Sequence, residues 1–309
     1  MRQGLKRQIE VGAARSGAVS LLSRRMRGRH LVLAYHNVVP RGELAWGEAS
    51  LHLPVERFRS HLRVLSESCT VVPLARLLRV TADESDTAAD RPLVAITFDD
   101  AYRGAATAGV EALEEFGFEA TFFLNPGLVR EPGFWWDRLA MSRGGELDEA
   151  VRAHCLDALA GRQEAVLAWA GAGGDELPEA PDYSCPSTHE GLLALAAQHH
   201  VSCECHTWSH PNLARISADE RADEFRQSFR WMEEHLSISP AFISYPYGSH
   251  DAAVDADAAA NPYRNAFRIE GGWLPAVPPP PFAVPRLAIP AGLSPEGLGL
   301  RLAGVGTPG

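Results

Sequence analysis

The sequence has no long apolar run and almost no lysine. Its 309 residues contain no stretch of about 18 apolar residues, so no membrane-spanning helix is expected. Lys6 is the only lysine, and the formal net charge is −10. Because nucleic-acid binding depends on clustered lysine and arginine, a chain of this composition argues against a nucleic-acid partner.

Cysteine is also scarce, and its pattern does not indicate a disulfide framework. The five cysteines are odd in number and scattered in spacing. Cys203 and Cys205 alternate along an expected strand and flank Glu204, a placement that would also suit soft metal ligands. We favour reduced, partly buried thiols, because free cysteine behaves as a small apolar residue.

The first 29 residues lack an apolar run long enough for a secretory signal. Their apolar residues are spaced as in an amphipathic helix, so we expect an N-terminal helical extension over 1–29 and a cytoplasmic location. The arginines near the end of this segment favour a solvated basic region. Peripheral contact with anionic lipid is the alternative.

Apolar strands alternate with helical segments along the rest of the chain, which is typical of a mostly parallel sheet. Strands are expected at 31–38, 93–98, 120–124, 201–205 and 241–245, and near 282–289. Helices are expected at 54–67, 104–116, 189–199, 217–236 and 294–303. Residues 81–91 are expected to form an exposed loop, and residues 126–188 an insertion with helical segments. The sequence therefore predicts one α/β catalytic domain over 30–309.

Side chains capable of chemistry follow four of these strands. The four segments are Tyr35–His36, Asp99–Asp100, 206–210 (HTWSH) and 245–248 (YPYG). The carboxyl ends of parallel strands meet at one edge of the sheet, where such folds place their active sites. We therefore expect these segments to converge.

Asp99 and Asp100 form a pair of adjacent carboxylates directly after an apolar strand. Two carboxylates are costly to bury unless they are neutralised by an opposite charge, hydrogen-bonded or bound to metal. Because the chain bends where the strand ends, both can face one cleft, one binding a cation while the other accepts a proton. A helix N-cap is the alternative for Asp100, because a helix follows soon after.

His206 and His210 are four residues apart, a spacing that places two imidazoles on one side of a helical turn, as in zinc sites. Together with Asp100 they predict a triad of one carboxylate and two imidazoles. Such a triad leaves positions on the metal open for water and substrate.

The segments TFDD, HTWSHP and YPYG, in this order at strand ends, resemble the polysaccharide deacetylases of the NodB-homology type, carbohydrate esterase family four. The resemblance covers roughly residues 30–290. The segments LVLAYHNV and FWWDRL resemble a bacterial branch found with surface-polysaccharide genes. The family implies an irregular (β/α) barrel with fewer than eight full repeats.

The resemblance also implies roles for individual residues. Asp99 would be the general base of a hydrolase that removes an N-acetyl group from an amino sugar of a glycan or glycan precursor. Asp100, His206 and His210 would hold one divalent metal ion, usually zinc. The backbone N–H of Tyr247 would face the oxyanion. The rings of Tyr247 and Trp208 are candidate contacts to the sugar, and the further candidates are Trp135, Trp136 and Trp273.

The sequence departs from the family pattern at several positions. Ala101 stands where the first motif usually ends in glycine. Ser244 stands where an arginine usually orients the base, and we predict that Arg286 replaces that arginine beside Asp99. The late Leu-x-x-His that usually supplies the general acid is not visible. His36 could act as the acid, or it could be a histidine with a structural role at a strand end.

Two alternatives to the main prediction stay open. One is a carbohydrate-binding protein that kept the fold without the activity, against which the retained base and metal ligands argue, because binding alone needs no base. The other keeps the chemistry but changes the substrate to a formylated or acetylated sugar on a carrier. A cytoplasmic location would favour a lipid-linked or nucleotide-linked precursor over finished cell wall.

Overall fold

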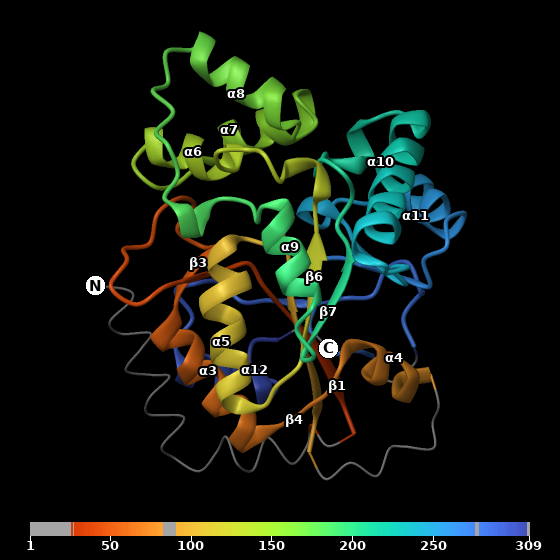
Figure 1. Ribbon diagram of the computed structural model, residues 1–309. Helices are drawn as coiled ribbons and strands as arrows, with labels where there is room; N and C mark the ends of the chain where they lie inside the picture. The colour runs from red at the N-terminus through yellow and green to blue at the C-terminus, as the bar shows by residue number, and fades with distance from the viewer. Residues whose placement is uncertain (1–25, 27, 83–90, 276–277, 308–309) are drawn as a thin grey trace.

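A computed structural model describes residues 26, 28–82, 91–275 and 278–307 (Figure 1). Nearly all of the expected N-terminal extension, 1–29, and most of the expected loop at 81–91 lie outside the described residues. No helix in the described part of the chain is both long and apolar enough to cross a membrane.

The centre of the molecule is a curled parallel sheet, and its strand order is β10-β1-β5-β6-β7-β8-β9, with the short β4 paired to β5. Its strands are β1 (His30–Tyr35), β4 (Thr70–Val71), β5 (Leu93–Phe98), β6 (Ala120–Leu124), β7 (Val201–Cys205), β8 (Phe242–Ser244), β9 (Asn265–Phe267) and β10 (Leu287–Ala288). A separate parallel pair joins β2 (Asn37–Val39) to β3 (His52–Pro54). The sheet and its surrounding helices confirm the predicted irregular (β/α) barrel.

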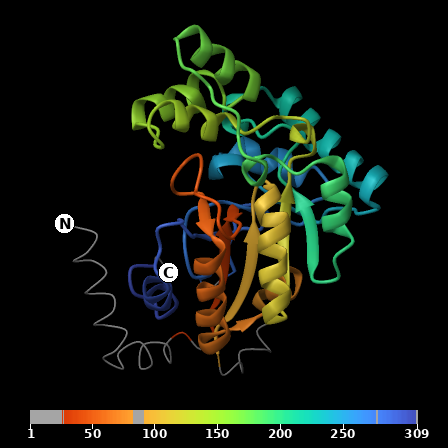
Figure 2. The same ribbon diagram turned by 60° about the vertical axis from the view of Figure 1, so that its left-hand side comes forward.

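Helices surround this sheet (Figures 1 and 2). The α-helices are α3 (Val55–Ser68), α4 (Leu74–Ala82), α5 (Val110–Phe116), α6 (Trp135–Ser142), α7 (Glu149–Ala153), α8 (Gln163–Ala172), α9 (His189–Ala196), α10 (Ala218–Trp231), α11 (Ala252–Ala259) and α12 (Pro295–Leu302). The described residues also form π-helical turns at η3 (Ala105–Gly109), η5 (His154–Ala158) and η8 (Met232–Leu236). Their 3₁₀ turns include η4 (Pro126–Leu128), η6 (Asp182–Ser184), η7 (Leu213–Arg215) and η9 (Pro246–Gly248).

Strand alternation sends successive side chains into two different clusters of buried residues. Phe98 and Phe122 stack at 4.7 Å and belong to the large cluster that packs under helices such as α3 and α5. Val32, Phe123 and Phe267 belong to a second cluster on the other face of the sheet. Burial on both faces explains why 93–98 and 120–124 read as continuous apolar runs, and both predicted strands are confirmed with these bounds.

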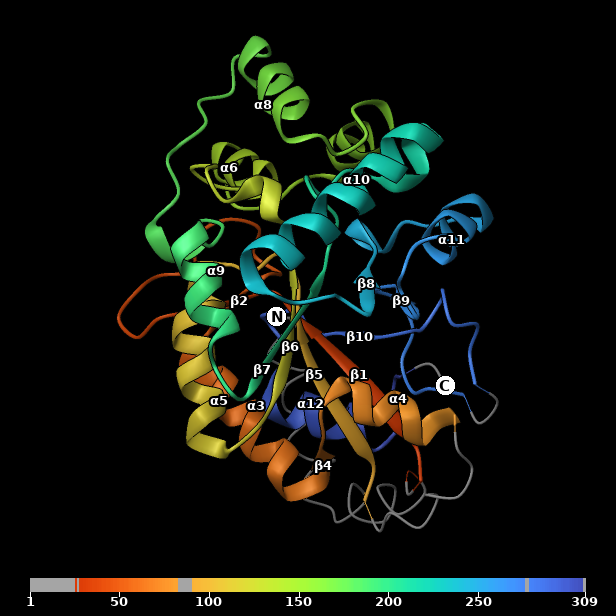
Figure 3. The same cartoon turned by 45° about the vertical axis from the view of Figure 1, so that its right-hand side comes forward.

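The expected insertion contains α6, α7 and α8, which lie beyond the carboxyl ends of the strands (Figures 1 and 3). It therefore stands over the edge where the predicted site residues emerge. The division of the chain into an extension over 1–29 and a catalytic domain over 30–309 stays a prediction. All five cysteines are free and buried, as expected.

Candidate active site

The structure brings Asp100, His206 and His210 together at the carboxyl ends of β5 and β7. One ligand atom from each lies within 4.8 Å of the others, and all three residues are buried. Asp100 Oδ1 is 3.4 Å from His206 Nε2 and 3.2 Å from His210 Nε2. Burial alone would raise the pKa of Asp100, but His210 and His206 lower it below the usual range, so the carboxyl group is ionised.

These three residues fit a divalent metal ion. Asp100 Oδ1 is buried and has no hydrogen-bond partner among the described residues, which leaves an acceptor free beside two imidazole nitrogens. One carboxylate oxygen and two imidazoles are a common donor set for zinc and related ions. The cluster can therefore hold a metal, as the sequence predicted.

Left-handed backbone turns bring these side chains together. Seven described residues other than glycine have positive φ angles, and five of them belong to the three site segments. Those five are Asp100 (69°), Ala101 (49°), Thr207 (67°), His210 (59°) and Tyr247 (58°). Non-glycine residues in this region cost free energy and tend to cluster at functional sites. Ala101 thus occupies a conformation that glycine adopts more readily.

Asp99 is held by Arg286, and the predicted contact is confirmed. Arg286 Nη1 donates to Asp99 Oδ1 at 2.8 Å, and Nη2 donates to Oδ2 at 2.6 Å. Arg286 lies just before β10, is fully buried, and passes over the ring of Phe123 at 5.4 Å. It therefore reaches the carboxyl end of β5 through the barrel interior.

Two hydroxyl groups complete this contact. Arg286 also donates to Ser244 Oγ at 2.7 Å and to Thr97 Oγ1 at 3.1 Å. Ser244 stands at the position where the resemblance implies an arginine. Its hydroxyl group accepts a hydrogen bond from Arg286. Burial opposes ionisation of Asp99, but the charge and hydrogen bonds of Arg286, together with the nearby His206 and His36, hold its pKa below the ordinary value.

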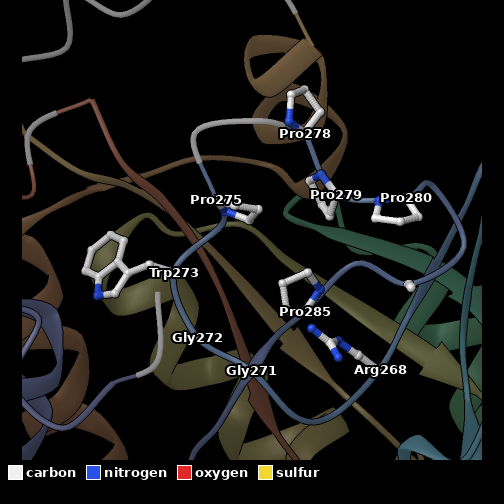
Figure 4. Close-up of a pocket in the computed structure, with 10 residues that line it drawn as sticks. Arg268, Gly271, Gly272, Trp273, Pro275, Pro278, Pro279, Pro280 and Pro285 are labelled. Atoms are coloured by element: carbon white, nitrogen blue, oxygen red, sulfur yellow. The ribbon is translucent and has the colours of Figure 1, made fainter.

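A pocket of about 550 Å³ is lined by Pro285, the residue before Arg286, and by Arg268 (Figure 4). It is lined mostly by proline and glycine, and Pro285 forms part of its wall. Arg268, also in the wall, accepts a hydrogen bond from Arg286 Nε through its carbonyl oxygen at 3.2 Å. The pocket therefore lies behind the residue that holds Asp99.

His36 lies between β1 and β2 and is partly exposed. Burial of the ring lowers its pKa, while the charges of Asp100 and Asp99 act in the opposite direction. Arg286 and His206 also influence it, so the imidazole faces the same site. A neutral imidazole with carboxylates nearby can gain and release a proton, but its role as an acid stays a prediction.

Tyr247 and Trp208, the two predicted sugar contacts, lie in different surroundings. The Tyr247 ring is 4.5 Å from the ring of His210, and its hydroxyl group donates to Gly161 O at 3.2 Å. The backbone of Trp208 accepts from Gly127 N at 2.9 Å and donates to Glu224 Oε2 at 2.8 Å. Tyr247 is thus packed against a proposed metal ligand, whereas Trp208 lies beside η4.

Tyr102 and Asp137 were not predicted as site residues, and Trp136 was predicted only as one of several candidate contacts to the sugar. The Trp136 ring lies 4.9 Å from the His210 ring, and its indole N–H donates to Tyr102 Oη at 2.7 Å. Tyr102 in turn donates to Asp137 Oδ2 at 2.8 Å. An aspartate inside the apolar FWWDRL segment is the sequence signal that could have indicated this buried cluster.

Comparison with known proteins shows the family. The sequence model of the polysaccharide deacetylase family matches residues 86–266, more than half of the 309 residues. The chain therefore belongs to the polysaccharide deacetylase family, and the resemblance drawn from its motifs is confirmed. It is accordingly a hydrolase, a carbohydrate N-deacetylase. The comparison with curated proteins finds no match to this sequence.

Solved structures of low sequence identity share the fold. The deacetylase PplD of Streptococcus pyogenes, solved in complex with acetate, has a TM-score of 0.61 at 17% identity over 87% of this chain and 96% of its own. A polysaccharide deacetylase from Bacillus cereus has a TM-score of 0.62 at 14% identity over 89% and 69%. IcaB from Ammonifex degensii has a TM-score of 0.58 at 16% identity over 89% and 96%.

Proposed function

We propose that this deacetylase is metal-dependent and removes the N-acetyl group from an amino sugar of a glycan or glycan precursor. The observation that carries the proposal is the pairing of two adjacent carboxylates with different surroundings. Asp100 lies among imidazoles with one oxygen free, whereas Asp99 is bound by a guanidinium. Asp100, His206 and His210 would hold the ion, and we propose Zn²⁺ because one carboxylate and two imidazoles suit zinc.

The ion, when bound, would polarise the acetamide oxygen and lower the pKa of water from about 15.7 toward about 7. Asp99 would accept the proton of the water that attacks the carbonyl carbon. Arg286 keeps that carboxylate ionised and fixes its direction by two parallel hydrogen bonds. His36 would donate a proton to the departing amine, and the backbone N–H of Tyr247 would face the oxyanion.

Exchanging each carboxylate for an amide tests these roles. Asp99→Asn should keep the bound Zn²⁺ and lower turnover by about 10²–10⁴-fold, the usual contribution of general acid–base catalysis. Asp100→Asn should lose the ion. Metal content is measured on the purified protein, and acetate release on a panel of N-acetylated oligosaccharides. Asp157→Asn, at an exposed aspartate, is the control that should change neither.

The outcomes distinguish the alternatives. If Asp99→Asn loses the ion and Asp100→Asn keeps it, the two roles are reversed. Bound metal without acetate release from any member of the panel would favour the carbohydrate-binding alternative. Release from a formylated or carrier-linked sugar alone would replace the substrate proposed here and keep the chemistry.

We further propose a cytoplasmic location, with peripheral membrane contact through residues 1–29. A carrier-linked precursor is the substrate that such a location would favour. Cell fractionation of the full chain tests both, because a chain found only outside the cytoplasm would contradict the location.

A further inference from the structure

The two imidazoles of the proposed metal site differ in how their second nitrogen is bonded. His206 Nδ1 donates to Ser244 O at 2.8 Å, which fixes the ring and leaves Nε2 toward Asp100. His210 Nδ1 is buried and has no hydrogen-bond partner among the described residues. Histidines that bind metal almost always donate their other N–H to a partner that orients the ring. His210 must therefore be oriented in another way.

Two aromatic rings pack against His210. The Trp136 ring is 4.9 Å away at an interplanar angle of 48°, and the Tyr247 ring is 4.5 Å away at 78°. These two rings also contact each other at 6.1 Å, nearly at right angles. Aromatic pairs at such separations attract each other and resist rotation in a packed interior. Packing therefore restrains the His210 ring in place of a hydrogen bond.

Trp136 is itself fixed by a hydrogen bond whose direction is unambiguous. An indole nitrogen can only donate, so Trp136 Nε1 donates to Tyr102 Oη at 2.7 Å. The hydroxyl proton of Tyr102 is then directed to Asp137 Oδ2, at 2.8 Å. All three residues are buried, and Tyr102 follows the strand-end segment that carries Asp100. The indole is thus tied to the same strand end as the metal ligands.

The network continues to β2 and β3. Asp137 Oδ1 accepts from Glu48 N and lies 2.9 Å from His52 Nε2. Asn37 Nδ2 lies 3.0 Å from His52 Nδ1 and also donates to Tyr183 O at 3.1 Å. Because the amide nitrogen must donate, His52 Nδ1 accepts and its Nε2 carries the proton toward Asp137. Asn37 Oδ1 has no hydrogen-bond partner among the described residues, but every hydrogen bond between these side chains has a defined donor and acceptor. A buried network of this kind favours one arrangement.

We propose that Trp136 is a positioning residue for His210, and that the buried Tyr102–Asp137–His52–Asn37 network holds Trp136 against that ring. The inference rests on the proposed function, because it takes His210 as a metal ligand. It also gives the insertion a role at the site, since Trp136 and Asp137 belong to α6. The network joins this helix to β2, to β3 and to the segment after β5.

The test measures the affinity of the full chain for Zn²⁺ by competition with a chelator. Trp136→Phe should weaken Zn²⁺ binding about 10–100-fold, the usual effect of losing a group that supports a ligand. Trp273→Phe is the matched control. Trp273 is also buried and donates through its indole nitrogen, to Arg301 O at 3.2 Å, but it pairs with Leu31 near the start of β1. That variant should bind Zn²⁺ as the wild type does.

A double variant separates the network from general loss of packing. Tyr102→Phe removes the acceptor for the Trp136 indole, so alone it should also weaken Zn²⁺ binding. In the Trp136→Phe background the indole N–H is already gone, and Tyr102→Phe should add less than about threefold, because residues in one network are not additive. Full additivity of the two effects would overturn the role given to the network.

His210→Ala distinguishes failure of this inference from failure of the proposed function. If His210→Ala abolishes Zn²⁺ binding while Trp136→Phe binds within about threefold of the wild type, the positioning role is wrong and the ligand set survives. If His210→Ala also leaves Zn²⁺ affinity unchanged, the ligand set fails and the inference fails with it. If Trp136→Phe does not fold, Tyr102→Phe, which keeps every aromatic ring, provides the measurement with the same two outcomes.

Discussion

The two sides of the Asp99–Asp100 site are held by different kinds of contact. The guanidinium side consists of Asp99, Thr97, Ser244 and Arg286, which are joined by short charged and polar hydrogen bonds. The aromatic side consists of His210, Trp136 and Tyr247, which contact one another through their rings.

The difference follows from what each side must hold. A buried carboxylate stays ionised only if a partner charge offsets its loss of solvation, so Asp99 needs a guanidinium. An imidazole that binds metal is neutral and needs only the correct ring orientation toward the ion, and packing can provide that orientation. Stability and turnover should therefore depend most on the charge of Arg286 on the guanidinium side. On the aromatic side, Zn²⁺ binding should depend most on the size and packing of the rings.

The largest effect should come from removing the charge of Arg286. In Arg286→Met the buried Asp99 carboxylate loses both guanidinium hydrogen bonds, and breaking a buried ion pair in this way costs about 3–5 kcal/mol. Arg286→Lys keeps a charge but cannot form two parallel hydrogen bonds, so it should also lose turnover. Chemical denaturation measures the free energy of unfolding, and acetate release measures turnover.

An exposed ion pair is the control for this experiment. Arg215 Nε lies 2.8 Å from Asp157 Oδ1, but the two side chains are 52% and 55% exposed. Arg215→Ala should therefore cost less than about 1 kcal/mol. Adding Asp99→Asn to Arg286→Met should recover part of the lost stability, because no charge is then left unpaired. Equal losses in Arg286→Met and Arg215→Ala would contradict the distinction between the two sides.

A pH profile tests the same contact with a smaller effect. In the wild type the pKa of Asp99 is below its ordinary value, because Arg286, together with His206 and His36, offsets the effect of burial. The stabilisation from this pair is therefore complete above the unfolded pKa and is lost as pH falls through the lower folded pKa. Arg286→Gln keeps a donor without the charge, so burial should raise the pKa.

The base must be ionised to accept a proton. As pH is lowered, the loss of kcat/KM should therefore begin at a higher pH in this variant than in the wild type. We expect the acidic limb of the kcat/KM profile to move upward by roughly one to three pH units, the usual influence of an adjacent opposite charge. The profile is measured at saturating Zn²⁺. Trp136→Phe is the comparison, because it should leave the acidic limb of the profile in place. If the acidic limb does not move in Arg286→Gln, Arg286 does not have the electrostatic role given to it here.

The guanidinium side could be predicted from the sequence, because short sequence patterns mark its strands and the residues that follow them. An apolar run predicts β5, and alternation of residue types predicts β7. The carboxyl ends of parallel strands converge, which places Asp99, Asp100 and the histidine pair at one edge. Arg286 is 187 positions from Asp99, yet it was predicted because a buried carboxylate without the usual arginine needs another cation.

The aromatic side and its network could not be predicted in the same way. Asn37, His52, Tyr102 and Asp137 are single polar residues in four separate segments, and only the packing of α6 against β2 and β3 brings them together. Neither β9, with three residues, nor the alanine-rich α11 was predicted, because periodicity needs a longer or more amphipathic stretch. The predicted helices at 104–116 and 217–236 are confirmed, but each includes a π-helical turn.

The smallest effect is expected at Ala101, which connects Asp100 of the metal cluster to Tyr102 of the network. Its φ angle of 49° is left-handed, a conformation that costs an L-residue with a Cβ roughly 1–2 kcal/mol. Ala101→Gly relieves this cost. It also loses a buried methyl group worth about 0.8 kcal/mol and adds freedom to the unfolded chain worth about 0.4–1 kcal/mol. These terms nearly cancel, so the free energy of unfolding should change by less than about 1 kcal/mol.

The same substitution at Ala112, buried in α5, provides the comparison. There the backbone is helical and no strain is relieved, while glycine in a helix costs about 1 kcal/mol relative to alanine, in addition to the lost methyl group. Ala112→Gly should therefore be less stable than Ala101→Gly by on the order of 1–2 kcal/mol in chemical denaturation. Both variants lose a buried methyl group, so the difference between their free energies of unfolding reports the difference in backbone conformation. Equal losses of stability in the two variants would mean that the left-handed backbone at Ala101 costs no free energy. The predicted relief of strain in Ala101→Gly would then be wrong.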